Sequence, residues 1–191
     1  ENATILIEDG RIAAVGPTAA MTYPAGTPTI DATGKTIVPG FIDAHAHGAY
    51  GDGELVPQQN WSLLQNLALG TTTIHDPSSN TTVFVAGDMQ RTGQLLGPRI
   101  FSTGRIIYGA RAPGAYAQID SLADALDHVR RLKAEGAPSV KNYNQPRRDQ
   151  RQMVVEAARR ENMLVVAEGG SLYGMDMNLI ADGNSTLEHN I

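Results

Sequence analysis

GKTIVPGFIDAHAHG, residues 34–48, is the stretch that decides the fold of this chain. A Pro-Gly pair at 39–40 breaks the β-rich residues before it, and the apolar residues 41–43 resume an extended run that ends in His45 and His47. Because successive side chains of a strand point to opposite faces, residues two apart share a face. We therefore expect His45 and His47 to project side by side from the end of a buried strand. Two neutral imidazoles in this arrangement can bind one cation such as Zn²⁺, and a pair of hydrogen-bonded pocket histidines is the alternative.

Composition and charge exclude several classes of partner. The chain has 191 residues, a formal net charge of -5, no cysteine and no run of Lys or Arg, which argues against nucleic acid or an anionic membrane as a partner. No segment approaches the roughly 20 apolar residues that a membrane span requires, and the first residues do not resemble a signal peptide. The absence of cysteine excludes disulfides and thiolate metal sites.

The pattern of roughly the first forty residues predicts a small β-rich region. Residues 4–16 are typical of two strands joined at Asp9-Gly10, a strong hairpin signal. A further strand is expected over 29–32. This region is too small to bury a core alone, and we interpret residues 1–38 as part of a small β-sandwich domain.

Strand and helix patterns alternate along residues 39–191, which predicts βαβ units and a parallel sheet. The expected helices are 61–69, 82–96, 121–136, 146–162 and 175–181, and 104–119 is a long loop. Six strands are expected, the first ending at His47 and the others at 71–75, 99–103, 139–143, 164–167 and 185–189. The ionisable residues fall at the strands' carboxyl ends, as in a (β/α)₈ barrel. A doubly wound sheet would also bind there, but it usually carries a glycine-rich phosphate loop, and none is present. We predict an α/β fold, a partial TIM barrel comprising the first six βα units.

Three further residues are candidates for the same site. Lys141 follows Val140 at a strand end, where a buried amine must be paired or neutralised. It would pair with Glu168, reach solvent, bind substrate, or ligate metal after conversion to a carbamate. Glu168, before two glycines, could act as a ligand, an acid–base group or the counter-ion of Lys141. We interpret His189 as a third imidazole directed at the same centre.

Substrate contacts are predicted for His75, Tyr143 and Arg147. His75 ends a strand at a His-Asp-Pro sequence, which is often only a turn. Tyr143 is the last residue of the strand expected over 139–143. Arg147 lies in the first turn of a helix, where positive charge opposes the macrodipole. This placement favours a solvated surface position, with anion recognition as the alternative.

The motifs together resemble the metal-dependent amidohydrolase superfamily. GFIDAHAH after a small β-sandwich is similar to the His-x-His end of that superfamily's first barrel strand, and TTTIHD at 71–76 resembles its second strand. Lys141 matches a fourth-strand lysine that is carboxylated in binuclear members, and His189 matches a sixth-strand histidine ligand. Residues 140–148 and the Glu-Gly-Gly at 168–170 look most like the bacterial branch fused to a Tol-type β-propeller.

The resemblance implies a hydrolase of amide-like carbon–nitrogen bonds that uses a metal-activated water. One or two divalent ions are expected, with Zn favoured over Mn or Fe, on His45, His47, Lys141, Glu168 and His189; Lys141 and Glu168 would also be catalytic. The partner would be a small amide-like or dipeptide substrate, in either the bacterial cytoplasm or the periplasm. A binding or structural module with a degraded metal site, a deaminase and a C–O hydrolase are the alternatives.

Two departures from the family pattern qualify this interpretation. Glu168 stands where the superfamily usually has a fifth-strand histidine, although a carboxylate can also ligate Zn²⁺, Mn²⁺ or Fe²⁺. The late strands and the eighth-strand aspartate that serves as general base are not found, so we expect a C-terminally truncated fragment. Such a fragment would be inactive, and its unpaired edge strands would favour homo-oligomers.

Overall fold

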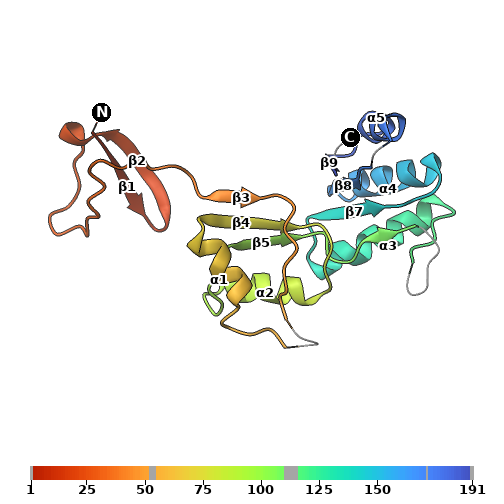
Figure 1. Ribbon diagram of the computed structural model, residues 1–191, viewed down its shortest axis with the longest axis horizontal. Coiled ribbons are helices and arrows are strands. Elements are labelled where there is room, and N and C mark those ends of the chain that lie inside the picture. The colour runs from red at the N-terminus through yellow and green to blue at the C-terminus, as the bar shows by residue number, and fades with distance from the viewer. Residues whose placement is uncertain (1, 52–54, 110–115, 171, 190–191) are drawn as a thin grey trace. The chain divides into compact units, whose positions relative to one another are not determined.

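The computed structural model describes residues 2–51, 55–109, 116–170 and 172–189 (Figure 1). The chain divides into two compact units, Glu1–Pro39 and Gly40–Ile191. None of the helices in the described ranges has the length and apolar character needed to cross a membrane.

The first unit is built around one β-hairpin. β1 (Ala3–Glu8) and β2 (Arg11–Pro17) pair antiparallel and are followed by the short 3-10 helix η1 (Thr18–Ala20). Asp9 and Gly10 adopt φ angles of 50° and 71°, the left-handed conformation that a tight two-residue hairpin turn requires. The strand predicted over 29–32 is wrong: β-branched residues make a strand only where a neighbouring strand supplies hydrogen bonds, and the described residues supply none there. Ile30 is accordingly 93% exposed.

The second unit begins with a three-stranded parallel sheet of order β3-β4-β5. Its strands and helices are β3 (Phe41–Asp43), α1 (Trp61–Ala68), β4 (Thr71–Asp76), α2 (Thr82–Arg91) and β5 (Arg99–Ser102). Figure 1 shows α1 and α2 along one side of this sheet. The helix predicted over 82–96 ends early, because Gly93 at φ 75° takes the chain out of the helical conformation.

The second sheet of this unit is also parallel, with order β6-β7-β8-β9. It comprises β6 (Ile107–Tyr108), α3 (Leu122–Glu135), β7 (Ser139–Tyr143), α4 (Arg148–Arg160), β8 (Leu164–Glu168), α5 (Tyr173–Ala181) and β9 (Thr186–Glu188). α3 begins with a capping box between Ser121 and Asp124 and ends at Gly136, which has a φ of 107°. β6 lies inside the segment predicted to be a loop, because two residues are too few to carry a periodic signal.

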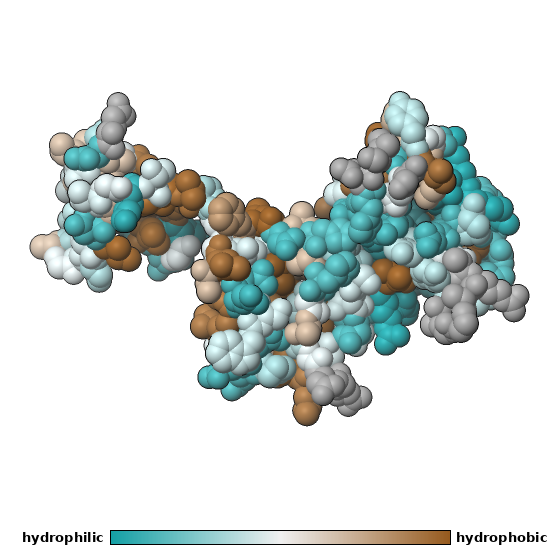
Figure 2. Space-filling model, viewed as in Figure 1, coloured by the Kyte–Doolittle hydropathy of each residue, from teal (hydrophilic) through white to brown (hydrophobic). Residues whose placement is uncertain are grey.

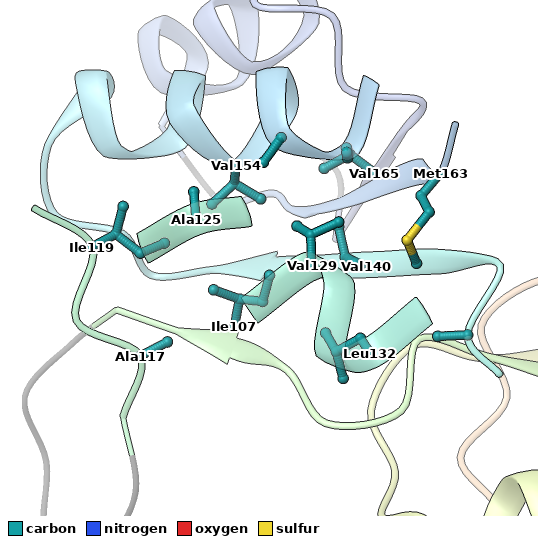
Figure 3. Close-up of a cluster of buried hydrophobic side chains, with 13 residues drawn as sticks. Ile107, Ala117, Ile119, Ala125, Val129, Leu132, Val140, Val154, Met163 and Val165 are labelled. Carbon is teal, nitrogen blue, oxygen red and sulfur yellow. The ribbon is translucent and has the colours of Figure 1, made fainter. Parts of the chain in front are cut away.

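Each sheet has its own hydrophobic cluster. The cluster between β7, β8, α3 and α4 is shown in Figure 3 and contains Val129, Leu132 and Val140, all fully buried. A second cluster packs α1 and α2 against β4 and β5 and contains Leu63 and Ile74. Phe84 packs against both clusters. No strand pairing joins β5 to β6 in the described part of the chain.

The fold is therefore mixed α/β with parallel sheets, as predicted. The arrangement of these sheets as part of a (β/α)₈ barrel stays a prediction. Figure 2 shows a largely hydrophilic surface over α3 and α4, whereas apolar surface gathers around β3 and β4. Phe41 and Ile42 of β3, at the edge of its sheet, are 64% and 67% exposed.

Candidate functional site

A cavity of about 380 Å³ brings together ionisable side chains from both sheets of the second unit. The residues that line it are His45, His47, Ser78, Ile106, Tyr108, Lys141, Tyr143, Glu168 and His189. All of them come from the carboxyl ends of strands or from the segments that follow, since parallel strands present these ends at one edge. Every residue predicted to ligate a metal therefore contributes to one cavity.

The two histidines of the His-x-His motif are adjacent, but not as neighbours on a strand. β3 ends at Asp43, whose Oδ1 accepts a hydrogen bond of 3.1 Å from the backbone N–H of His45. This turn carries both imidazoles beyond the sheet, so the predicted strand geometry is wrong. The Nε2 atoms of His45 and His47 nevertheless face each other at 3.2 Å.

A carboxylate lies behind each imidazole. Glu188 contacts Nδ1 of His45, and its other oxygen accepts a hydrogen bond of 2.7 Å from the Thr186 hydroxyl. Burial alone would raise the pKa of Glu188, but these two bonds outweigh burial and lower that pKa. Asp76, 1% exposed, lies 3.7 Å from Nδ1 of His47. A carboxylate that accepts a hydrogen bond from Nδ1, as Glu188 does at His45, keeps the proton on that nitrogen and leaves Nε2 free as a ligand. Asp76 lies beyond hydrogen-bond distance of His47 and acts on that ring through its charge alone.

Lys141 and Glu168 form a buried ion pair. The side chain of Lys141 is 2% exposed, and its Nζ lies 2.6 Å from Oε2 of Glu168. The other oxygen of Glu168 lies 3.2 Å from Nε2 of His189, whose side chain is 56% exposed. Burial, and then the charge of Glu168, raise the pKa of the neighbouring Tyr143. The amine of Lys141 is thus paired with Glu168, which is one of the alternatives expected from the sequence.

Two residues predicted to contact substrate are not among those that line the cavity. Nε2 of His75 lies 2.9 Å from the hydroxyl of Ser139, so this side chain links β4 to β7. Burial lowers the pKa of His75, against the opposing effect of its bond to the Ala44 backbone. Nε of Arg147 lies 3.1 Å from Oδ1 of Asp149, and the arginine side chain is 57% exposed. Tyr143, the third predicted contact, does line the cavity.

Sequence reasoning missed Glu188 and Tyr108. On a regular strand, the side chains of Glu188 and His189 would point to opposite faces of the sheet. His189 has a φ of 53°, which breaks this alternation and lets both side chains reach the site. No local signal in the sequence reveals that angle. The strand-end Asp-Pro position of Asp76 is typical of a carboxylate that accepts backbone N–H bonds. Asp76 accepts one of 2.8 Å from Ser78.

The donor types fit a divalent cation, and one pair has suitable spacing. Metal–nitrogen bonds of roughly 2.0–2.1 Å in a tetrahedron place two nitrogens about 3.3 Å apart, close to the 3.2 Å between the imidazoles. Within the described ranges, no three His, Cys, Asp or Glu side chains are grouped to hold one ion. The pair is spaced for two ligands of one ion, and the other donors would have to shift to complete a site.

Comparison with known proteins gives local sequence matches. Residues 5–22 match the family model of an imidazolonepropionase-like composite domain of bacteria. A 50-residue stretch is 50% identical to the imidazolonepropionase of Halobacterium salinarum, covering 24% of this chain and 12% of that protein. A 74-residue stretch is 43% identical to the adenine deaminase of Paracoccus denitrificans, covering 38% of this chain and 12% of that protein.

The fold comparison covers almost the whole chain. A crystal structure described as a candidate prolidase from Bifidobacterium longum superposes with a TM-score of 0.78 and 26% identity over 98% of this chain. The chain spans 49% of the length of that structure. A Xaa-Pro dipeptidase with bound methionine shares the fold, with a TM-score of 0.68, 20% identity and coverage of 98% of this chain and 56% of its own. The sequence and fold matches together support the amidohydrolase superfamily for this chain.

Proposed function

We propose that the whole protein is a metal-dependent hydrolase of carbon–nitrogen bonds in small amide-like molecules: cyclic amides, N-acyl amino acids or dipeptides. The observation that carries the proposal is the imidazole pair of His45 and His47, with Nε2 atoms 3.2 Å apart and a carboxylate behind each ring. The names of the imidazolonepropionase and prolidase relatives support the same class of bond.

Protonation explains why this pair favours a cation. The bond to Glu188 favours a protonated Nδ1 on His45, and the nearby charge of Asp76 favours the same tautomer of His47, which leaves two Nε2 lone pairs facing each other. Two acceptors at this distance repel unless a proton or a metal ion lies between them. A Zn²⁺ ion, or alternatively Mn²⁺ or Fe²⁺, would be held by His45 and His47 and, once bound, would polarise the scissile carbonyl and acidify water.

Lys141 and Glu168 contribute in one of two charge states in this proposal. Without ions the amine form is favoured, because a carbamate would put a second negative group beside Glu168, where the ammonium now lies at 2.6 Å. Added cations would offset that repulsion and allow the neutral amine of Lys141 to add CO₂ with loss of a proton, which would make the lysine a carbamate ligand. Glu168 would then exchange its lysine partner for His189 or a ligand position.

We also propose that the two parallel sheets are consecutive arcs of one (β/α)₈ barrel. The bond between His75 and Ser139 supports this arrangement, since it connects side chains of β4 and β7, which belong to different sheets. The placement of the cavity at the carboxyl ends of the strands is the second support, because TIM-barrel active sites lie at that face.

A deaminase is the second candidate function. The stretch matched to adenine deaminase is longer than the stretch matched to the Halobacterium salinarum imidazolonepropionase, 74 residues against 50. Deamination also breaks a carbon–nitrogen bond, but it releases ammonia from an amidine-like carbon. A coupled ammonia assay with adenine and related bases separates the two reactions, since hydrolysis of N-acyl amino acids and dipeptides yields no ammonia.

The proposal is tested by metal content and turnover together. In the whole protein, replacing both His45 and His47 by Ala should remove nearly all bound transition metal and reduce amide hydrolysis at least 100-fold. His128→Ala, in α3 and outside the cavity, is the matched control and should change neither. Elemental analysis that finds unchanged metal stoichiometry in the double variant would contradict the metal assignment. Absence of hydrolysis across N-acyl amino acids, dipeptides and cyclic amides in the metal-loaded protein would contradict the activity.

A further inference from the structure

The four strands of the second sheet carry a row of side chains across their carboxyl ends. Tyr108 of β6 is in register with Tyr143 of β7, and Glu168 of β8 is in register with Glu188 of β9. The β7–β8 register pairs Asn142 with Ala167, so the next residues, Tyr143 and Glu168, are also neighbours. We call Tyr108, Tyr143, Glu168 and Glu188 the terminal row. Two strand steps of about 4.8 Å place Tyr108 about 10 Å from Glu168.

The terminal row divides the cavity into an ionic half and an aromatic half. Glu168 and Glu188 contact Lys141, His45 and His189. The rings of Tyr108 and Tyr143, by contrast, stack with centroids 5.2 Å apart and an angle of 27° between their planes. Ile106 joins them in the cavity wall. A ligand whose polar group lies in the ionic half would therefore extend its side chain over aromatic surface.

Backbone hydrogen bonds hold the aromatic half in place before any ligand binds. The carbonyl of Tyr143 accepts a bond of 2.9 Å from the N–H of Gly109, and the carbonyl of Tyr108 accepts one of 2.7 Å from Ala117. The Gln145 side chain, 3% exposed, donates a bond of 3.1 Å to the carbonyl of Ile107. A wall that is ordered in advance loses little conformational entropy when a ligand packs on it.

The charges nearby select among the side chains that an aromatic wall can bind. Tyrosine faces attract cations as well as aromatic rings. In the metal-free protein, the ammonium of Lys141 already lies 5.9 Å from the centroid of Tyr143, so a second cation would compete for the same ring. An anionic side chain would meet the electron-rich ring faces and the charge of Glu168. An aromatic side chain avoids both penalties.

We propose that Tyr108, together with Tyr143 and Ile106, forms a subsite for an aromatic side chain of the substrate. The subsite rests on the proposed function only for the bond that is cleaved, because the selectivity comes from the wall itself. Tyr108 would then determine specificity, acting through the face of its ring rather than through its hydroxyl.

Binding of three probes tests the subsite without requiring turnover. N-acetyl-L-phenylalanine, N-acetyl-L-alanine and N-acetyl-L-lysine share one polar end and differ in the side chain. Calorimetric titration of the purified protein should give a dissociation constant for the phenylalanine probe about tenfold below that of the alanine probe. Tyr108→Ala should abolish this ratio, and Tyr108→Phe should keep it. Tyr173→Ala is the control, since this tyrosine of α5 is 65% exposed.

Each failure has a distinct meaning. An unchanged ratio in folded Tyr108→Ala, a lysine probe that binds most tightly, or no binding of any probe would overturn the subsite. If Tyr108→Ala does not fold, Ile106→Ser tests the same wall by the same ratio. Selective binding without hydrolysis of any amide would keep the subsite and refute the proposed function. Hydrolysis with no preference for aromatic substrates would keep the proposed function and refute the subsite.

Discussion

Replacing Glu168 by Gln would leave the buried ammonium of Lys141 without the carboxylate that compensates its charge. The two groups lie 2.6 Å apart, and the side chain of Lys141 is 2% exposed. Removing one partner of a buried ion pair typically costs about 3–5 kcal/mol, because the remaining charge stays desolvated. The side chain of Glu168 is 16% exposed, so some water can reach the amine, and we expect the lower end, about 3 kcal/mol. For a chain of this size, that loss lowers the Tm by about 6–12 °C.

A second substitution separates the charge effect from a packing effect. Lys141→Met in the Glu168→Gln background removes the stranded charge at similar volume and should recover most of the lost stability. Glu156→Gln is the matched control, because Glu156 pairs with Arg159 and Arg160 at the surface and exposed pairs contribute little. Urea unfolding followed by circular dichroism, in the presence of a chelator, measures all four proteins.

The same variant has a spectroscopic consequence. The charge of Glu168 is one of the causes, after burial, that raise the pKa of Tyr143. Glu168→Gln should therefore shift that pKa downward, as followed by the ultraviolet absorbance of tyrosinate. A Glu168→Gln protein that loses less than about 1 kcal/mol, or a double variant no more stable than the single one, would refute the reasoning.

Two other substitutions test the frame around the site. Gly169→Ala should destabilise the fold by about 1–3 kcal/mol and weaken the binding of any ligand at the imidazole pair, because a Cβ there would clash with the backbone carbonyl of Glu188. Gly170→Ala is the control and should be neutral, because a Cβ there meets open space. Equal effects of the two variants in denaturant titrations would contradict this. Asp182→Asn should lower the Tm by about 2–4 °C at pH 7, because Arg148 donates to this carboxylate at 2.7 Å and holds its pKa below the usual 3.8. A lowered pKa stabilises the fold above pH 3.8 and loses that contribution as the pH falls through the folded-state value, so the variant and the parent should converge in acid; a difference that persists there would refute the assignment.

Elements with local signals were predictable from the sequence. The Ser121 cap, the Gly136 stop and the Asp9-Gly10 turn each need only a few adjacent residues, and all three are present in the structure. Elements that depend on distant partners were not predictable in the same way. The segment 29–32 has strand composition but finds no partner in the described residues, and the two-residue strand β6 exists because β7 supplies one.

The candidate site follows the same division. Strand order and alternation predicted that His45, Lys141 and Glu168 converge, because parallel strands bring their carboxyl ends together. The carboxylate behind His45 could not be predicted, since the position of Glu188 depends on the backbone angle of the following residue. His75 was expected to contact substrate, but it bonds to Ser139 on the other sheet, 64 residues away in the chain.

The separation of the two parallel sheets has a consequence for motion. His45 and His47 follow β3 of the first parallel sheet, whereas Lys141, Glu168 and Glu188 lie on strands of the second, β6–β9. Each sheet has its own hydrophobic cluster, and Phe84 packs against both. An opening between the sheets would therefore separate Phe84 from one cluster but leave both clusters intact, and it would dismantle the site before it unfolded the domain. A molecule that touches both sides of the cavity would oppose this opening and slow amide hydrogen exchange along the strands on both sides. Occupancy of the site and rigidity of the domain are therefore one coupled equilibrium.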